Sequence, residues 1–320
     1  MQNIAILCSG GDVSGMNAAL KRFVEYAYSK GLNPYFIYNG FEGMIDNHIV
    51  KAGYEDVAGI ITRGGTKIGS ARSKRFMEKA YRATAVENLK SHRIDAVVVL
   101  GGDGSFKGMQ MLSQESDIAF AGIPATIDND IAGTEYSLGV DTALNIIKHA
   151  IDAVRDTASS FGRAFVIETM GRGCGYLALV SALTSGAEMC LIPEIPYDLQ
   201  SYQKRFIAEK SKGRSYFIAV VSEALDATET VREWFEEKIG IEARSVILGH
   251  TQRGGNPTVH DRLMAYRFVT HAMDGLLAGK RDAVICYNDG GFSAKSIDDV
   301  AFKRYTISRD LLVLGKEYGR

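Results

Sequence analysis

The chain has 320 residues, of which 46% are hydrophobic and 23% are charged, a composition typical of globular rather than disordered proteins. Lysine and arginine (37) nearly balance aspartate and glutamate (38), so the formal charge of −1 gives no reason to expect nucleic acid or an anionic membrane as partner. No apolar run approaches the roughly 18 residues that a membrane span needs. The length predicts two domains, each with its own core.

Short apolar runs alternate with helical patterns along the chain. The runs that predict buried strands are 3–8, 34–38, 96–100, 118–123, 164–168, 216–221 and 245–248. The clearest helical patterns cover 16–30, 81–92 and 138–157. This alternation predicts an α/β protein with parallel sheets, although no linker-like composition marks a domain boundary.

The first residues of the chain and its cysteines bear on the cellular compartment in which the protein works. Met1-Gln2-Asn3 leads straight into an apolar run, without the basic segment and cleavage pattern of a secretory signal. The four cysteines form no CxxC pair, which argues against a disulfide framework and a zinc site: Cys8, Cys174, Cys190 and Cys286. We therefore expect a reduced, cytoplasmic protein whose cysteines are small buried hydrophobes.

Most of the 34 glycines cluster just after the apolar runs. Gly10-Gly11-Asp12 follows the first predicted strand, and Gly101-Gly102-Asp103-Gly104-Ser105 follows a later one. Such turns expose backbone amides to an anion at a helix N-terminus, although a single one is equally explained as a tight turn. Asp103 beside a phosphate would suit Mg²⁺. Neither a GxxxxGK[ST] loop nor a GxGxxG dinucleotide fingerprint is present.

Carboxylates and arginines follow other strands. In the segment 126–130, Asp128 and Asp130 could bind metal, cap a helix or act as a base toward an attacking hydroxyl. Arg72, Arg172 and Arg253 adjoin glycine turns, where a guanidinium can bind phosphate through two hydrogen bonds. His250 has no partner at metal-ligand spacing, so a hydrogen-bonding role is favoured. These residues indicate an α/β enzyme that moves a phosphoryl group from a nucleotide to a phosphorylated acceptor.

The same motifs, in this order, resemble the bacterial ATP-dependent 6-phosphofructokinases over nearly the whole chain. They are SGGD and GMNAA (9–19), RGGT and GSAR (63–72), GGDGS (101–105), TIDNDI and GT (126–134), RDT (155–157), MGR and CG (170–175), Glu223, and LGH, QRGG and Pro (248–257). GGDG alone also occurs in NAD kinases and diacylglycerol kinases, but the set together is specific.

The resemblance implies two Rossmann-like, three-layer α/β/α domains with mainly parallel sheets. Residues 1–139 plus 252–305 would bind ATP, and residues 140–251 plus 306–320 would bind the sugar phosphate. It also implies a cytoplasmic homotetramer of glycolysis that transfers the γ-phosphate of MgATP to the 1-hydroxyl of fructose 6-phosphate.

The resemblance further implies roles for individual residues. Asp128 would be the base, Thr126 and Arg172 would hold the transferring phosphoryl group, and Asp103, supported by Asp130, would organise Mg²⁺. The ATP site would comprise Gly11, Phe41, Arg72, Ser73, Gly102, Asp103, Gly104, Ser105 and Gly108. The sugar-phosphate site would comprise Thr126, Ile127, Asp128, Met170, Gly171, Arg172, Glu223, His250 and Arg253, with Arg163 and Arg244 supplied by a neighbouring subunit.

Two positions bear on the phosphoryl donor. Pyrophosphate-using relatives carry Asp where this chain has Gly104, and Lys where it has Ala125, so we expect ATP as donor. Ala125 departs from the glycine usual in ATP users, but it is small and neutral. Phe41 and Ser73 stand where bacterial enzymes often have Tyr and Phe around the adenine, which leaves the base preference open.

The family's effector site is only partly kept. Lys21, Arg155, Glu188, Lys212 and Arg214 retain the pattern. Glu25 and Tyr54 replace arginines that bind effector phosphates, and Gly59 replaces an aspartate. A carboxylate in place of a cation repels phosphate, so we expect ADP activation and phosphoenolpyruvate inhibition to be weakened or lost.

Two other readings remain open at this stage. One is a related phosphotransferase that uses pyrophosphate or another sugar phosphate, such as sedoheptulose 7-phosphate. The other is a non-catalytic nucleotide-sensing subunit, against which the complete set of Asp103, Asp128 and Arg172 argues.

Overall fold

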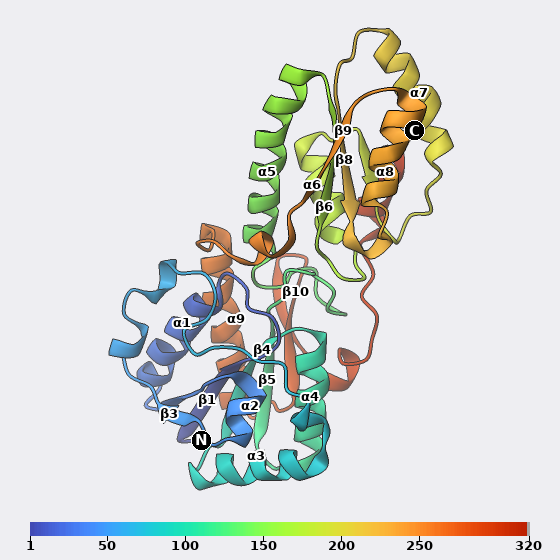
Figure 1. Ribbon diagram of the computed structural model, residues 1–320. Coiled ribbons are helices and arrows are strands. Elements are labelled where there is room, and N and C mark those ends of the chain that lie inside the picture. Colours follow the sequence, from blue (N-terminus) through green and yellow to red (C-terminus); the bar gives the residue numbers. More distant parts are fainter. Residues whose placement is uncertain (319–320) are drawn as a thin grey trace. The chain divides into compact units, whose positions relative to one another are not determined.

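The computed structural model describes residues 1–318 and divides into two compact units (Figure 1). Unit 1 comprises Met1–Thr142 and Arg253–Tyr305; unit 2 comprises Ala143–Gln252 and the described residues from Thr306 onward. The chain therefore passes between the units three times. Each unit has its own sheet and its own core.

Unit 1 is built on a seven-stranded sheet in the order β11-β10-β5-β4-β1-β2-β3. The five central strands are parallel, and β3 and β11 pair antiparallel at the two edges. The bounds are β1 Asn3–Cys8, β2 Asn33–Ile37, β3 Ile49–Lys51, β4 Ala96–Gly101, β5 Ala119–Pro124, β10 Ala283–Asn288 and β11 Gly291–Ser296.

Helices cover both faces of this sheet because alternate residues of the strands point to opposite sides. The core on one face joins Leu7 and Val97 to α2 (Gly40–Ile45), α3 (Lys79–Ser91) and α4 (Asp103–Glu115). Ile4, Ile6 and Val98 alternate with these residues and are also fully buried. The other helices of the unit, α1 (Met16–Ser29) and α9 (Val259–Leu277), pack against each other and against strands of the sheet.

Unit 2 has a four-stranded parallel sheet in the order β7-β8-β6-β9. An aromatic stack fills one side of it, with Phe206 lying 4.6 Å from Phe217 and 5.6 Å from Phe235 between ring centroids. The strands are β6 Ala164–Thr169, β7 Met189–Leu191, β8 Phe217–Ser222 and β9 Ala243–Ile247. The helices are α5 Val140–Phe161, α6 Tyr176–Ser185, α7 Leu199–Ser211, α8 Thr228–Trp234 and α10 Arg309–Tyr318.

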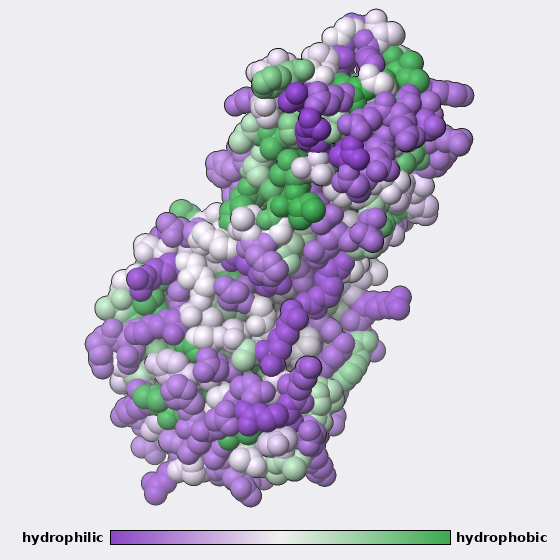
Figure 2. Space-filling model, viewed as in Figure 1, coloured by the Kyte–Doolittle hydropathy of each residue, from purple (hydrophilic) through white to green (hydrophobic). Residues whose placement is uncertain are grey.

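The expected α/β class with mainly parallel sheets is confirmed. The helix expected from residue 138 begins instead at Val140, because Leu138 bonds back to Pro124 O (2.8 Å) and Gly139 adopts a φ of +97°. The last expected strand, 245–248, is β9 at Ala243–Ile247. Figure 2 shows a mainly hydrophilic surface with smaller hydrophobic areas, in keeping with the composition.

A buried carboxylate fixes the start of α5 within unit 1. Asp261 of α9 accepts hydrogen bonds from the backbone amides of Gly139 and Thr142 (2.8 Å each), from Thr142 Oγ1 (2.5 Å) and from the Tyr136 hydroxyl. Burial raises the pKa of Asp261, and these donors oppose that shift. Fully buried and surrounded by donors, this carboxylate joins α9 to the loop that leads into α5.

We predict that Asp261→Asn destabilises the protein, because one of its two oxygens becomes an amide that points at hydrogen-bond donors. The expected loss in the free energy of unfolding is about 2–4 kcal/mol. The matched control is Asp152→Asn, which breaks an exposed pair with Lys148 (2.7 Å) and is expected to change stability by less than about 0.5 kcal/mol. Guanidinium denaturation measures both, and equal stabilities would contradict this role.

Candidate active site

Three neighbouring strands of unit 1 end in the segments that the sequence singled out. β5, β4 and β1 are adjacent and parallel, so their carboxyl ends lie at one edge of the sheet. Hydrogen bonds to β4 continue past the ends of β1 and β5: Ser9 N donates to Leu100 O (2.9 Å) and Ala125 N donates to Gly101 O (2.9 Å). The two glycine turns and the aspartate segment therefore lie side by side.

The first glycine turn carries a neighbour from far along the chain. Gly10 has a φ of +86°, and its amide donates to Ala71 O (3.4 Å) while its carbonyl accepts from Ser70 Oγ (2.8 Å). These bonds place the exposed Arg72 next to the Gly10-Gly11 turn. The arginine and the first glycine turn thus come together as the sequence suggested.

The second glycine turn leads into α4, whose first residue is Asp103. A side chain on Gly101 would overlap Ser105 and lie 2.9 Å from Ser9 O, so this position requires glycine. At Gly104, by contrast, a Cβ would meet nothing within 4 Å. The turn thus presents the start of a 13-residue helix to open space, the arrangement that binds phosphate groups.

The aspartate segment lies directly beside this turn. A Cβ on Gly102 would contact Thr126 Cβ at 3.5 Å, and Thr126 Oγ1 accepts a hydrogen bond from Asp128 N (3.2 Å). Asp128 is only 2% exposed. Asn129, which sequence reasoning passed over, shapes the segment: its φ is +49°, and its side chain bonds Glu135 O (3.0 Å) and Ser137 N (2.9 Å).

Arg253 reaches the first glycine turn from the other end of the chain. A Cβ on Gly11 would overlap the Arg253 guanidinium, which donates to Asp12 O at 3.4 Å. The segment after Arg253 is held there because Ser14 Oγ donates to Gly255 O at 2.7 Å. Glycine at position 11 therefore makes room for an arginine as well as for a turn.

The predicted metal residue is a single carboxylate. The described residues contain no cluster of three or more His, Cys, Asp or Glu side chains able to hold a metal by themselves. Mg²⁺ commonly binds through one or two carboxylates together with substrate phosphates and waters, so Asp103 at an anion-binding turn fits this ion. Lys107, which sequence reasoning missed although it lies at helical i+4 spacing, contacts Asp103 with 2.6 Å between Nζ and Oδ2.

Phe41, which is expected beside the adenine, packs against a second aromatic ring. Phe41 is 4% exposed and stacks on Phe76 at 4.1 Å, while Gly108 allows both rings to approach α4. Ser73 Oγ accepts from Phe76 N (3.0 Å) and so helps to position that ring. The face of Phe41 that Phe76 covers is closed to a nucleobase.

In unit 2, the loop after β6 is organised by a carboxylate. Glu223 Oε1 accepts hydrogen bonds from the amides of Gly171 (3.2 Å) and Arg172 (2.8 Å), and the φ angles of these residues are +142° and +55°. Met170 N donates to the side chain of the buried Gln252 (3.1 Å), a positioning contact that the sequence did not signal. Four of the expected sugar-phosphate residues, Met170–Arg172 and Glu223, are thereby brought together, while His250 is exposed in the short helix that follows β9.

Arg163 and Arg244 lie at the other end of the same sheet. Arg163 directly precedes β6 and Arg244 is the second residue of β9, whereas Met170 directly follows β6. Arg163 Nε bonds Glu242 Oε2 (2.8 Å), and Arg244 also pairs with Glu242. The six residues of β6, at about 3.3 Å each, separate Arg163 from the Met170 loop, and Arg244 lies level with Phe165 near the start of that strand.

In unit 1, Lys21, which is expected at the effector site, is paired with Glu25. Lys21 Nζ forms an ion pair with Glu25 (2.5 Å), and Glu25 also accepts from the Tyr266 hydroxyl (3.3 Å). Tyr54 stacks on Tyr28 at 5.0 Å between ring centroids. The charge of Lys21 is thus already balanced by a carboxylate one helical turn away.

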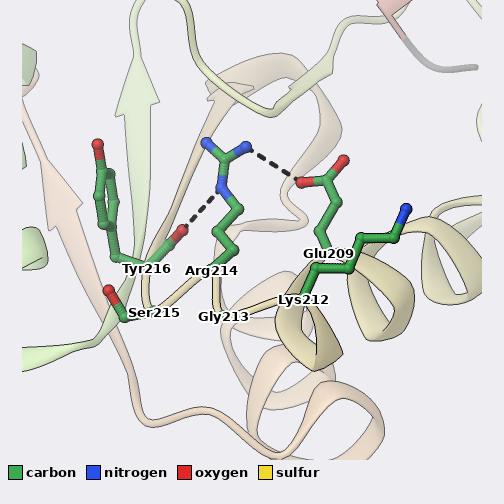
Figure 3. Close-up of a pocket in the computed structure, with 6 residues that line it drawn as sticks. All are labelled: Glu209, Lys212, Gly213, Arg214, Ser215 and Tyr216. Atoms are coloured by element: carbon green, nitrogen blue, oxygen red, sulfur yellow. Dashed lines mark hydrogen bonds and ion pairs between the residues drawn. The ribbon is translucent and has the colours of Figure 1, made fainter.

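Three of the residues expected at the effector site in unit 2 lie together: Arg155 and Arg214 are beside Glu188, whose pKa is raised by burial. Arg214 pairs with Glu188, and Arg155 lies 3.9 Å from it. Arg214 also bonds Glu209 (3.1 Å) at the wall of a surface cavity of about 430 Å³ (Figure 3). Lys212 extends from the same rim away from Arg214 (Figure 3).

The cysteines lie in surroundings that suppress thiol chemistry. Burial raises the pKa of Cys8 and of Cys190 to about 12, and that of Cys286 to about 11. Cys174 is buried as well. None of these surroundings favours a nucleophilic thiolate.

Comparisons with known proteins identify the family of this chain. A family model described as phosphofructokinase matches residues 3–276. An ATP-dependent 6-phosphofructokinase of Sulfurovum sp. (strain NBC37-1) is 69% identical over 99% of this chain and 98% of its own length. Another, from Sulfurimonas denitrificans, is 60% identical over 99% of this chain and 100% of its own length.

A solved structure of Pichia pastoris phosphofructokinase in the T-state superposes with a TM-score of 0.85 at 32% identity. The match covers 93% of this chain, which spans 35% of that longer one. The chain belongs to the phosphofructokinase family. None of its described helices has the length and apolar character needed to span a membrane.

Proposed function

We propose that the protein is an ATP-dependent 6-phosphofructokinase of glycolysis, working in the cytoplasm. It transfers the γ-phosphate of MgATP to the 1-hydroxyl of fructose 6-phosphate and yields fructose 1,6-bisphosphate and ADP. The observation that carries this proposal is the unobstructed Gly102–Ser105 turn at the start of α4, with the buried Asp128 segment directly beside it. The names of the relatives at 69% and 60% identity support it.

In this proposal unit 1 binds the nucleotide. The amides of the Gly102–Ser105 turn hold the phosphates at the N-terminus of α4, and Arg72 and the Gly11 turn contact them from the neighbouring strand. Ser73 and Gly108 line the base region together with an edge of Phe41. Asp103, with Asp130 in support, would hold Mg²⁺, which when bound draws negative charge from the transferring phosphoryl group.

The chemical step centres on Asp128. Its carboxylate takes the proton of the 1-hydroxyl as the hydroxyl oxygen bonds to the γ-phosphorus, and the bond from that phosphorus to the bridging oxygen breaks to release ADP. Thr126 and Arg172 hold the phosphoryl group, and Ile127 contacts the sugar. The buried position of Asp128 supports this role, since a base is most effective where water is excluded.

Unit 2 supplies the sugar-phosphate residues in this proposal. The loop Met170–Arg172 is held by Glu223 and Gln252, so its backbone is already ordered for a ligand. His250 of the same unit and, from unit 1, Arg253 and the segment Thr126–Asp128 complete the set of residues assigned to fructose 6-phosphate.

The places of Arg163 and Arg244 support a homotetramer. β6 separates Arg163 from the Met170 loop, and Arg244 lies near the start of the same strand, so in this proposal both arginines serve the site of a neighbouring subunit. The exposed Phe161, two residues before Arg163, favours a subunit contact there. Analytical ultracentrifugation tests this assembly, and an active monomer would contradict it.

The donor is argued from Gly104 and Ala125. Gly104 leaves open space at the turn, whereas the aspartate of pyrophosphate users would place a negative charge there. Ala125 is buried, so a lysine at that position would need room that this chain does not provide. Both positions favour ATP over pyrophosphate.

We predict that Gly104→Asp weakens ATP use while the protein stays folded. Aspartate suits the first turn of a helix, but its charge repels phosphate, so the KM for ATP is expected to rise about 10–100-fold. Gly104→Ala is the matched control and is expected to stay within about threefold of the original KM, because its Cβ meets nothing. Initial rates with ATP, GTP and pyrophosphate measure this, and activity with pyrophosphate alone would overturn the donor assignment.

We predict that Asp128→Ala lowers turnover by about 10²–10⁴-fold, because the hydroxyl proton loses its acceptor. Asp128→Asn keeps the shape of the side chain and is expected to lose a similar factor, which separates loss of the base from loss of packing. Product formation at saturating ATP and fructose 6-phosphate measures both variants. Normal turnover in either would remove Asp128 from this role, and absence of activity in the unaltered protein would favour a nucleotide-sensing subunit.

Regulation by phosphorylated effectors is proposed to be weak. The Glu25 carboxylate repels phosphate and forms an ion pair with Lys21. In unit 2, the charges of Arg155 and Arg214 are balanced by ion pairs with Glu188 and Glu209. We predict that ADP and phosphoenolpyruvate each shift half-saturation by fructose 6-phosphate by less than about twofold, because an effector that does not discriminate between two states shifts nothing. Saturation curves with and without each effector test this, and a large shift would refute it.

A further inference from the structure

The first two turns of α4 contain a cation that the proposed reaction does not use. Lys107 Nζ lies 2.6 Å from Asp103 Oδ2, and about one third of each side chain is exposed to solvent (36% and 33%). Lys107 Nζ also lies 5.2 Å from the ring centre of Phe302, a residue with a φ of +62° whose side chain is 60% exposed. The ammonium group therefore rests between a carboxylate and an aromatic ring at an accessible surface.

The partner of Lys107 is the side chain that fits Mg²⁺. A carboxylate that neutralises an ammonium group attracts a metal ion less strongly, because two like charges then compete for its oxygens. The pair with Lys107 and a metal ion at Asp103 therefore compete for the same carboxylate. Entry of a divalent cation at Asp103 favours movement of Lys107 to another negative partner.

The place to which Lys107 can move is also defined. Gly104 leaves open space between Asp103 and the next turn, and this is where α4 presents its N-terminal amides. The lysine stem has four flexible carbons and ends in a compact charge, so it can turn without any change of the backbone. A nucleotide phosphate bound at the Gly102–Ser105 turn would lie within its reach, because Lys107 already contacts Asp103 of that turn.

We propose that Lys107 is a nucleotide-phosphate ligand that Asp103 holds in place until Mg²⁺ enters, an inference that rests on the proposed function. Lys107 contributes positive charge to the phosphates of a bound nucleoside diphosphate or triphosphate. Its contribution is largest when Mg²⁺ is present, because the metal ion then takes the Asp103 oxygens and frees the ammonium group for the phosphates.

The experiment measures ADP affinity by calorimetry, with and without saturating Mg²⁺, in the unaltered protein, Lys107→Met and Lys107→Arg. Lys107→Met is expected to weaken Mg²⁺-bound ADP binding about tenfold and metal-free ADP binding by less than about threefold, because Asp103 holds Lys107 when no metal is present. Lys107→Arg keeps the charge and is expected to stay within about threefold of the unaltered protein in both conditions.

Lys148→Met is the matched control, since Lys148 forms the same i,i+4 pair with Asp152 on α5. It is expected to leave both affinities unchanged. A purely structural Lys107 would likewise leave both ADP affinities unchanged in Lys107→Met, and that result would overturn the proposal, as would an equal loss in the two conditions. An unaltered protein that binds no ADP in either condition would instead overturn the proposed function itself.

Discussion

Backbone amides at the start of α4 can hold a phosphate only where no side chain stands in front of them, and this constraint governs the composition of the site. Gly101 must be glycine because Ser105 and Ser9 leave no space for a Cβ. Gly104 is different, because the space beside it is open. Gly101 lets the turn pack against Ser105 and Ser9, and Gly104 keeps the start of α4 accessible to a phosphate.

The parallel sheet turns this local constraint into a site. Because β1, β4 and β5 are neighbours, the Gly10 turn, the start of α4 and the Asp128 segment share one edge. Unit 2 uses the corresponding edge in another way. There the Glu223 carboxylate occupies the amides of Gly171 and Arg172, so the loop after β6 is ordered by the protein itself and these two amides are not open to a ligand.

Much of this arrangement could be predicted from the sequence, because strands, glycine turns and carboxylates follow one another locally. The apolar run before Gly101 indicated β4, and the motif that follows it indicated an anion site. The contacts that the sequence did not indicate depend on tertiary neighbours. Gln252 bonds a residue 82 positions earlier, and Arg253 lies over a glycine near the N-terminus. Lys107 could have been found, since i,i+4 spacing from Asp103 on a helix predicts their contact. The burial of Phe41 against Phe76 could not be inferred from either residue alone.

In the proposed function, the triphosphate of ATP lies on the Gly102–Ser105 turn with Mg²⁺ at Asp103. A crystal structure with Mg²⁺, fructose 6-phosphate and a non-hydrolysable ATP analogue tests it most directly. The account predicts phosphate oxygens within hydrogen-bond distance of the α4 amides and Mg²⁺ bound to Asp103 directly or through one water. A triphosphate bound elsewhere, with the Gly102–Ser105 turn facing solvent, would contradict it.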